Sequence, residues 1–349
     1  MAEPIRLLTA VPICDGHDSA INTINLEFIR HGIEVVYLGY HRSARDIVRA
    51  AIQEGVRAIG ISSYNGGHVE FFTEIIALLK KQRASHIGVF GGGGGTITKR
   101  DAVILRRKGV DRIFFAGEPL AEIVAFVKKT YARQAAHPPA FSRLSTLNSQ
   151  RSTLCIGITG PGGAGKTTLI DELVLRWLKA QPEARIAILS HDPSITGKGA
   201  LLGDRATMIH SQDDRVFMRS LATRGRAGGL SPDTTRWLRA MKGGGFDVVF
   251  IETVGIGQEA LPFRRGLVDR SIFVMGSDYG SRLQLQKIVM LDAADIVVVN
   301  KGDLAGSATA VAEIEERLAA NKRGQRVIAT VAKRHRDSGV DRLFEEVRK

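Results

Sequence analysis

The residues best suited to chemistry form a glycine-rich loop between an apolar run and an amphipathic stretch. The sequence Gly160-Pro161-Gly162-Gly163-Ala164-Gly165-Lys166-Thr167-Thr168 fits the pattern G-x-x-x-x-G-K-T. Successive backbone N–H groups of such a loop can wrap phosphates, its lysine can reach the β and γ phosphates, and the Thr167 hydroxyl can bind magnesium. The predicted phosphate-binding residues are Gly162, Gly163, Ala164, Gly165, Lys166, Thr167 and Thr168.

A second motif indicates which base this loop serves. Asn300, Lys301 and Asp303 form the pattern Asn-Lys-x-Asp directly after the apolar run Val297–Val299. The Asp303 carboxylate can accept two hydrogen bonds from the guanine edge and is mismatched to adenine. The sequence therefore predicts GTP rather than ATP, with these three residues at the nucleotide.

Three carboxylates are candidates for a magnesium site beside the Thr167 hydroxyl. Glu252 ends an apolar run and precedes Thr253-Val254-Gly255, Asp192 ends another run, and Asp204 follows Gly203. Magnesium prefers one or two carboxylates together with phosphate oxygens. We predict Glu252 and Asp192 at this site, with Asp204 as the weaker candidate, and Lys166, Asp192 and Glu252 as the catalytic residues.

A histidine near the N-terminus has the surroundings of a metal ligand. Asp15-Gly16-His17-Asp18 follows the first apolar run. A carboxylate placed two residues before an imidazole can accept a hydrogen bond from one ring nitrogen, which leaves the other nitrogen for a metal. Small residues in Ser62–His68 and Gly91–Gly95 follow two further apolar runs and would let a bulky planar ligand approach the backbone.

Alternating apolar and amphipathic segments must position these residues. In the first third they predict five βα units and a doubly wound parallel sheet, with ligands at the carboxyl ends of its strands. The expected strands are Arg6–Pro12, Glu34–Leu38, Ala58–Ser63, His86–Phe90 and Arg112–Phe115. The expected helices are Ile21–Arg30, Ala44–Glu54, Val69–Lys81, Ala102–Lys108 and Leu120–Lys129.

A polar stretch without periodicity separates this module from a second α/β module. We predict a cofactor domain over residues 1–132, a linker over 133–153 and a P-loop domain over 154–349. The second module is expected to be doubly wound as well. Its expected strands are Leu154–Thr159, Arg185–Ser190, Val216–Arg219, Asp247–Glu252, Ser271–Met275, Asp295–Asn300 and Val327–Thr330.

Composition excludes several classes of protein. The chain has 349 residues, 44% of them hydrophobic and 24% charged, which is typical of globular domains. The net charge of +13 is dispersed and only 6% of residues are aromatic, so we expect no nucleic-acid partner. We also expect no membrane segment and no signal peptide, and the two cysteines, in different modules, predict no disulfide; together these indicate a cytoplasmic protein.

The first module resembles the cobalamin-binding domain of base-off, His-on acyl-CoA mutases, and in particular of fused isobutyryl-CoA mutases. The family pattern falls on Asp15, His17, Ser62 and Gly91-Gly92, with Ala20 and Tyr64 as departures. The resemblance implies a flavodoxin-like five-stranded domain that binds adenosylcobalamin with His17 on cobalt. The residues it places at the cofactor are Asp15, Gly16, His17, Asp18, Ser62, Tyr64, Gly91, Gly92 and Gly93.

The second module resembles the G-protein chaperones of these mutases. The likeness lies in Ala200–Arg205, Arg219–Gly225 and Glu252–Gln258, and Gly276–Lys287 matches their third switch. One departure is Thr207, where the family has an arginine, and it predicts slow intrinsic GTP hydrolysis unless Arg205 or a partner supplies the charge. A second departure is Val331-Ala332-Lys333 in the base-contact loop.

Together the resemblances imply a cobalamin-binding small subunit of an acyl-CoA mutase fused to its GTPase metallochaperone. The chain stops at Lys349, before a substrate barrel, so we expect either a natural small subunit whose partner is a separate large barrel subunit or a truncated part of a longer protein. An adenosyltransferase is a further candidate partner, and a homo-oligomer is expected. Two alternatives stay open: a corrinoid methyl carrier and a cobalamin sensor with a regulatory GTPase.

Overall fold

The structure is a computed structural model that describes residues 3–13, 15–17, 19–134, 152–195, 197–255, 263, 266–276, 289–320 and 323–349. These residues divide into two units. One unit combines the chain up to residue 134 with Pro193–Ala206, and the other combines residues 152–192 with the chain from Thr207 onward. The first unit is therefore discontinuous in sequence, which the predicted boundaries did not anticipate.

The first unit is built on a parallel sheet with the strand order β5-β4-β3-β1-β2-β8. Its strands are β1 Arg6–Ala10, β2 Glu34–Tyr37, β3 Ala58–Ser62, β4 Gly88–Gly93, β5 Arg112–Phe115 and β8 Ala200–Leu202. The order of the first five strands is that of flavodoxin-like folds, so this prediction is confirmed. Because parallel strands are covered on both faces, they are buried along their whole length, as β1 shows.

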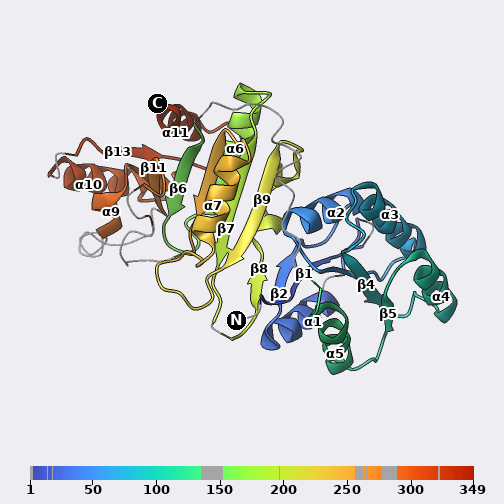
Figure 1. Cartoon of the computed structure of the whole chain (residues 1–349). Coiled ribbons are helices and arrows are strands. Elements are labelled where there is room, and N and C mark those ends of the chain that lie inside the picture. Colours follow the sequence, from blue (N-terminus) through green and yellow to red (C-terminus); the bar gives the residue numbers. More distant parts are fainter. Residues whose placement is uncertain are drawn as a thin grey trace. The chain divides into compact units, whose positions relative to one another are not determined.

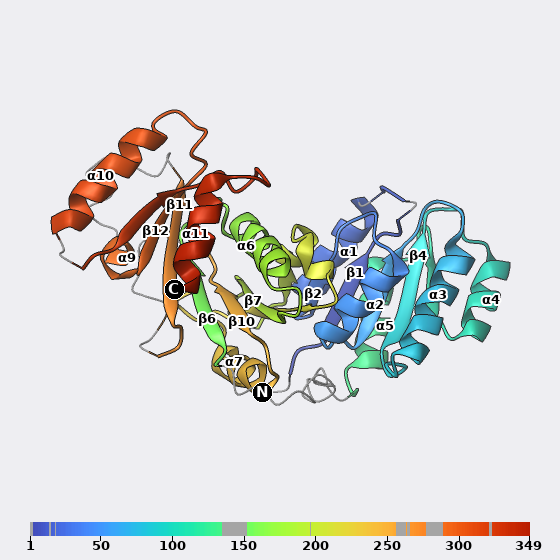
Figure 2. The same ribbon diagram turned by 90° about the horizontal axis from the view of Figure 1, so that it is seen from above.

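Helices cover both faces of this sheet. They are α1 Ser19–Arg30, α2 Ala44–Gln53, α3 His68–Lys81, α4 Lys99–Lys108 and α5 Leu120–Tyr131. Helices α1 and α5 lie on one face, and α2, α3 and α4 lie on the other (Figures 1 and 2). Local capping fixes two of their starts: the Ser43 side chain accepts from Asp46 N before α2, and Thr98 and Asp101 form a capping box before α4.

Two features of this sheet differ from the predicted strands. Strand β4 begins at Gly88 rather than His86 and continues through Gly93, so part of the glycine run is strand rather than loop. Strand β8, which comes from the segment after β7 of the P-loop unit, was not predicted. Its pairing partner β2 lies far away in the sequence, so no local pattern indicates it.

The second unit contains a parallel sheet of seven strands in the order β13-β12-β11-β6-β10-β7-β9. The strands are β6 Leu154–Thr159, β7 Ile186–Asp192, β9 Val216–Ala222, β10 Val248–Glu252, β11 Arg270–Gly276, β12 Ile296–Asn300 and β13 Arg326–Ala329. All seven predicted strands of this unit are present, with ends shifted by a few residues. The doubly wound P-loop fold is confirmed.

Alternate residues of these strands pack on helices at opposite faces. Helices α6 Lys166–Ala180 and α11 Ser338–Arg348 share one core with Ile156, Phe250 and Val274. On the other face lie α7 Thr234–Gly243, α9 Val289–Ala293 and α10 Ser307–Ala320. Two short 3-10 turns complete the described elements, η2 Asp204–Ala206 in the first unit and η3 His210–Gln212 in the second.

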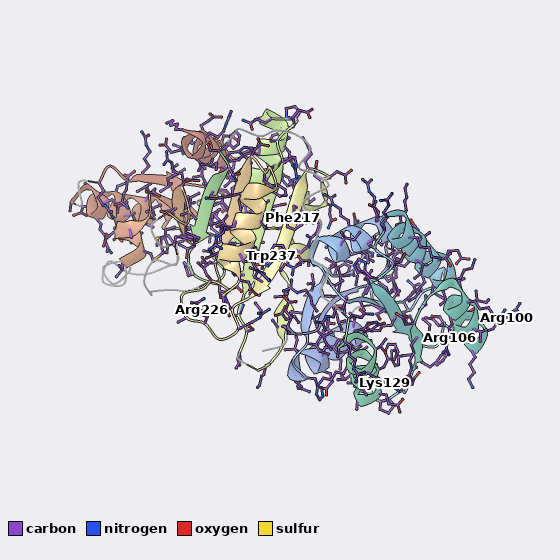
Figure 3. All side chains as sticks on the ribbon, viewed as in Figure 1. Arg100, Arg106, Lys129, Phe217, Arg226 and Trp237 are labelled. Atoms are coloured by element: carbon purple, nitrogen blue, oxygen red, sulfur yellow. The ribbon has the colours of Figure 1, made fainter. Side chains whose placement is uncertain are left out.

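Exposed basic side chains occur in both units of this chain, whose net charge is +13. In Figure 3, Arg100 and Arg106 extend from α4 and Lys129 from α5, while Arg226 lies on the loop after β9. All four side chains belong to exposed residues. Among the described helices, none is long and apolar enough to cross a membrane.

Candidate functional site

In the first unit, Asp15 holds His17 in a fixed orientation after β1. Asp15 Oδ1 lies 2.8 Å from His17 Nδ1 and accepts the His17 backbone N–H at 3.0 Å. Asp15 is fully buried, whereas 62% of the His17 side chain is exposed. Because a carboxylate oxygen can only accept from Nδ1, this contact leaves Nε2 for a metal.

The charge of Asp15 is stabilised by backbone N–H groups from a second loop. Its Oδ2 accepts hydrogen bonds from Tyr64 N and from Asn65 N, the latter at 3.2 Å. Burial by itself raises the pKa of Asp15, but the hydrogen bonds from Tyr64, His17 and Asn65 outweigh it and lower that pKa below its usual value. The loop after β3 therefore keeps Asp15 ionised and oriented toward His17.

A cavity of about 590 Å³ opens beside His17 at this edge of the sheet. Its lining is mainly apolar and includes Ser62, Tyr64, Phe90, Gly91, Phe114 and Leu120. Thr9 also lines the cavity, and its buried hydroxyl has no hydrogen-bond partner among the described residues. A mainly apolar cavity of this size, with a few polar groups in its lining, fits a bulky cofactor group that carries some polar atoms.

The glycines of β4 and the residue after it allow the close packing that shapes this cavity. A Cβ on Gly91 would lie 2.4 Å from Ile61 O, and one on Gly93 would lie 1.7 Å from Ser63 O. A Cβ on Gly94 would lie 2.4 Å from Tyr64 Cε2, and the Tyr64 ring in turn lies 4.7 Å from the His17 ring. The predicted residues Asp15, His17, Ser62, Tyr64 and Gly91 to Gly93 are thus gathered, with Gly16 on the same loop.

In the second unit, the P-loop connects β6 to α6 as predicted. Lys166 Nζ donates to the carbonyl oxygens of Gly160 and Pro161 at 3.0 and 3.1 Å. Gly163 and Gly165 have φ values of 75° and 87°, which only glycine adopts readily. Glycine is therefore required at two positions of this loop, and Thr168 is exposed at the start of the helix.

The predicted magnesium residues are partly brought together. Thr167 Oγ1 donates to Glu252 Oε1 at 2.8 Å, and Glu252 is buried at the end of β10. Asp192 ends the neighbouring strand β7. These groups fit magnesium, which takes a hydroxyl and one or two carboxylates beside phosphate oxygens. In the described residues, the protein provides no cluster of three or more metal-ligating His, Cys, Asp or Glu side chains.

Asp204 and Arg205 belong to the first unit, whereas Thr167 belongs to the second. Asp204 begins η2, and Arg205 is fully buried, with its Nε 3.2 Å from Glu54 Oε1. The structure does not gather Asp204 with the other magnesium candidates within one unit, so its role stays a prediction. Arg205 contacts Glu54 within the first unit, and its predicted role near the phosphates stays a prediction.

The base-binding motif is tied to the P-loop through Asn300. Its Nδ2 donates to Ala164 O at 2.9 Å, and its Oδ1 accepts from Ala332 N and the Thr330 hydroxyl. Asp303 lies 2.5 Å from Lys333 Nζ, and this ion pair lowers the pKa of Asp303. Lys301 occupies the left-handed region with φ of 59°. The three residues of the base-binding motif thus lie at the carboxyl end of β12. Lys333 comes from the loop whose sequence departs from the family pattern, and it forms an ion pair with Asp303.

Sequence reasoning missed His191, a buried residue next to Asp192. Its Nδ1 lies 2.7 Å from the carbonyl oxygen of Glu252, and its Nε2 lies 2.8 Å from Thr234 Oγ1 at the start of α7. Burial lowers the pKa of His191 to about 4, so the ring is neutral at physiological pH. A lone histidine within a strand gives no functional signal in sequence. Only its contacts in the structure show that His191 lies against Glu252, a magnesium candidate.

Some predicted residues lie outside the described part of the chain. They are Asp18, residues 256–258 of the Glu252–Gln258 match, and nearly all of the third-switch match, from 277 to 287. Most of the predicted linker also falls there. These predictions are therefore not tested by the geometry.

Two family models match the chain in complementary regions. The B12 binding domain model matches residues 5–125, and the model of the methylmalonyl-CoA mutase-associated GTPase MeaB matches residues 120–349. The junction between the two models falls in α5, which ends the first unit's continuous part.

Relatives with both parts are similar over nearly the whole chain. Fused isobutyryl-CoA mutase of Geobacillus kaustophilus is 37% identical over 97% of this chain and 36% of the relative, and that of Cupriavidus metallidurans is 36% identical over 99% and 35%. The mouse protein named methylmalonic aciduria type A homolog, mitochondrial, is 34% identical over 53% of this chain and 46% of the relative. This chain thus spans about a third of the length of the fused mutases it matches.

These matches confirm both resemblances found in the sequence. The cobalamin-binding pattern lies on the unit with the exposed His17, and the GTPase pattern lies on the unit with the P-loop. The chain belongs to the methylmalonyl-CoA mutase-associated GTPase MeaB family and joins a GTPase domain of that family to a B12-binding domain.

Proposed function

We propose that this chain binds adenosylcobalamin through His17 and uses GTP to gate the loading and protection of that cofactor for an acyl-CoA mutase. The observation that carries the proposal is the Asp15–His17 pair at the mouth of a deep cavity, in one chain with a P-loop and a guanine motif. A GTPase on the same polypeptide as a cobalamin site has an evident use if it controls that cofactor.

On the cobalamin side, the protein would supply a nitrogen ligand for cobalt and a cavity for part of the cofactor. His17 Nε2 would bind cobalt while Asp15 accepts the Nδ1 proton and keeps the ring oriented. The cavity between α1, β4 and α5 would take the displaced nucleotide tail, and its apolar walls would exclude water. Adenosylcobalamin, when bound, supplies a cobalt–carbon bond that breaks homolytically.

On the GTP side, the residues divide into binding and catalytic groups. The P-loop N–H groups and Lys166 would hold the β and γ phosphates, and Asp303 would read guanine. Thr167, Glu252 and Asp192 would hold magnesium beside the phosphates. Since Thr167 and Lys166 contact protein oxygens in the structure, GTP and magnesium binding would exchange these contacts for contacts to the nucleotide. Such an exchange can switch loop order.

The partner in this proposal is a mutase barrel that encloses the acyl-CoA substrate. Fused isobutyryl-CoA mutases are about three times the length that this chain covers, and the remainder of those proteins would hold the catalytic part. The protein would present the cofactor to that partner, and GTP binding and hydrolysis would control when the cofactor is transferred or protected.

Reconstitution tests the proposal in two stages. The chain is mixed with adenosylcobalamin and GTP, and absorbance, electron paramagnetic resonance of the cobalt(II) form and calorimetry are recorded. We expect base-off cobalamin with coupling to nitrogen from ¹⁵N-labelled protein, and a preference for GTP over ATP that Asp303→Asn reduces. A base-on spectrum or equal binding of ATP and GTP would contradict the assignment.

The second stage separates the proposal from a methyl carrier or a sensor. A candidate large subunit is added with C4 acyl-CoA substrates, and isomerisation is followed. We expect activity only with both proteins present. Methyl transfer to a corrinoid-dependent acceptor without isomerisation would favour the carrier instead.

A further inference from the structure

A segment of GTPase-family sequence completes the sheet of the cobalamin-binding unit. Residues Gly197–Ala206 lie within the match to the GTPase family, yet they belong to the first unit. We call this the docking segment. It follows Asp192 of the P-loop unit and returns to that unit at Thr207. Part of the GTPase-family sequence therefore pairs with the edge of β2 that faces away from β1.

The docking segment is attached by backbone pairing and close packing. Gly199 N donates to Ile29 O at 2.8 Å, and β8 pairs in parallel with β2 through Ala200, Leu201 and Leu202. Ala200 and Leu202 are buried, while Leu201 is 44% exposed, which is the alternation of a strand with one covered face. An added Cβ at Gly199 would lie 1.9 Å from Ile33 O, so only glycine permits this approach.

A buried cation from the docking segment completes a chain of charges in the cobalamin unit. Arg6 contacts Glu34 at 2.6 Å and Glu54 at 3.3 Å, and Arg205 contacts Glu54 at 3.2 Å. Glu54 and Arg205 are fully buried. Without Arg205 the group would hold two carboxylates and one guanidinium, which is unfavourable in a buried site. The cobalamin unit is therefore electrostatically complete only with the docking segment in place.

The far end of the docking segment contacts residues that lead to the His17 loop. Arg42 Nη2 donates to Ala206 O at 2.6 Å, and the Arg42 backbone N–H donates to Val11 O beside the Asp15 loop. His41, next to Arg42, lies 3.0 Å from Ile13 O through its Nδ1. An added Cβ at Gly16 would lie 3.9 Å from the His41 ring, so this ring is adjacent to the loop that carries His17.

Both ends of the docking segment are continuous with the nucleotide site. Its start follows Asp192, a magnesium candidate, and after its end the backbone N–H groups of Ile209 and His210 donate to Asp171 on α6, the helix that begins at Lys166. We propose that the β2 edge is the docking surface through which the GTPase acts on cobalamin, with the docking segment as its partner and Arg42 as the link to the His17 loop. This inference rests on the proposed function above.

The test compares two glycines of the docking segment. Gly199→Ala places a methyl group against Ile33 O, whereas Gly203→Ala meets nothing within 4 Å, so the second variant is a matched control. The cobalamin dissociation constant is measured with GDP and with a non-hydrolysable GTP analogue, in the full chain with magnesium. Hydrogen exchange of β2 and β8 reports whether the strand is docked.

We expect the two nucleotides to change cobalamin affinity by at least about fivefold in the wild-type chain, and cobalamin to change the ratio of nucleotide affinities by the same factor. Gly203→Ala should retain this ratio. Gly199→Ala should speed hydrogen exchange in β8 and bring the ratio close to one, while each ligand still binds. Arg42→Gln, which leaves β8 in place, should also reduce the ratio and covers the case in which Gly199→Ala does not fold.

The outcomes distinguish the two levels of inference. A wild-type chain that binds no cobalamin or no GTP would contradict the proposed function. A wild-type chain that binds both ligands with no nucleotide-dependent ratio would overturn the docking proposal alone. A ratio retained in Arg42→Gln, and in a Gly199→Ala variant that folds, would overturn it as well.

Discussion

Two buried carboxylates, Asp15 and Glu252, show how differently the two sites are prepared. Both follow or end a parallel strand, and both are almost fully inaccessible. Asp15 accepts backbone N–H groups of His17, Tyr64 and Asn65, which cannot leave without refolding two loops. Glu252 accepts a hydrogen bond from the Thr167 side chain, which can rotate away. The cobalamin site is thus fixed in advance, whereas the nucleotide site is held by contacts that its ligand can replace.

The largest expected effect comes from removing His17, the proposed ligand of cobalt. In His17→Ala the proposed nitrogen ligand is lost, so the ¹⁵N coupling should vanish and cobalamin affinity should fall by about 100-fold or more. The measurement is electron paramagnetic resonance with a parallel binding titration. His31→Ala, a change of the same size at an exposed position after α1, should leave both readouts unchanged; a His17→Ala spectrum identical to wild type would remove the basis of the comparison.

The next largest effect is expected on GTP affinity at the nucleotide site, whose contacts the ligand can replace. Lys166→Ala removes the ammonium that would contact phosphate, and a hydrogen bond to a charged group of this kind corresponds to about 10- to 100-fold in affinity. Calorimetry with GTP and magnesium measures the loss. Lys179→Ala, near the end of the same helix, is the control and should bind GTP normally. If Lys166→Ala bound GTP as tightly as the wild type, we would conclude that Lys166 keeps its contacts to the Gly160 and Pro161 carbonyl oxygens in the wild-type complex with GTP.

An intermediate effect is expected when the Asp15 clamp is weakened rather than the ligand removed. Asp15→Asn keeps the shape but loses the charge, and loss of such an orienting partner costs about 10- to 100-fold in metal affinity. The protein nitrogen coupling should persist, because His17 is still present. Cobalamin affinity is measured beside that of Asp111→Asn, a carboxylate on the other side of the unit. Wild-type affinity in Asp15→Asn would show that the backbone alone orients His17.

The smallest effect is expected at His191, whose ring contacts the backbone carbonyl oxygen of Glu252. His191→Phe removes both contacts, to the Glu252 carbonyl and to Thr234, while keeping an aromatic ring. We expect kcat for GTP hydrolysis to fall by roughly tenfold, in line with the loss of buried hydrogen bonds, with little change in KM. Thr234→Ser keeps the hydroxyl and should behave as wild type. A raised KM with normal kcat would instead assign His191 to nucleotide binding.

Most of both sheets could be predicted because their strands are locally encoded. Apolar runs such as Val297–Val299 are buried on both faces, and glycine and polar residues mark where they end. The P-loop and the Asp15–His17 pair were predicted for the same reason, since each is a short contiguous motif.

The residues that were not predicted depend on contacts between distant segments. Ala200-Leu201-Leu202 indicates a family motif in sequence, but its strand character comes from pairing with β2. Arg205 belongs to that same motif, yet its side chain is fixed by Glu54 in the other module of the predicted layout. His191 gains meaning only from the Glu252 carbonyl and Thr234. Local periodicity carries no information on such partners.

The position of β8 in the chain has a consequence for synthesis on the ribosome. Chains emerge from the N-terminus and domains tend to fold as they appear. The first five strands of the cobalamin unit are complete once β5 has emerged, but the edge of β2 and the buried Glu54 wait for residues that are translated after the P-loop, α6 and β7. A nascent first unit therefore carries an open strand edge, and two buried carboxylates that share the single Arg6 guanidinium, until much of the GTPase core has been made.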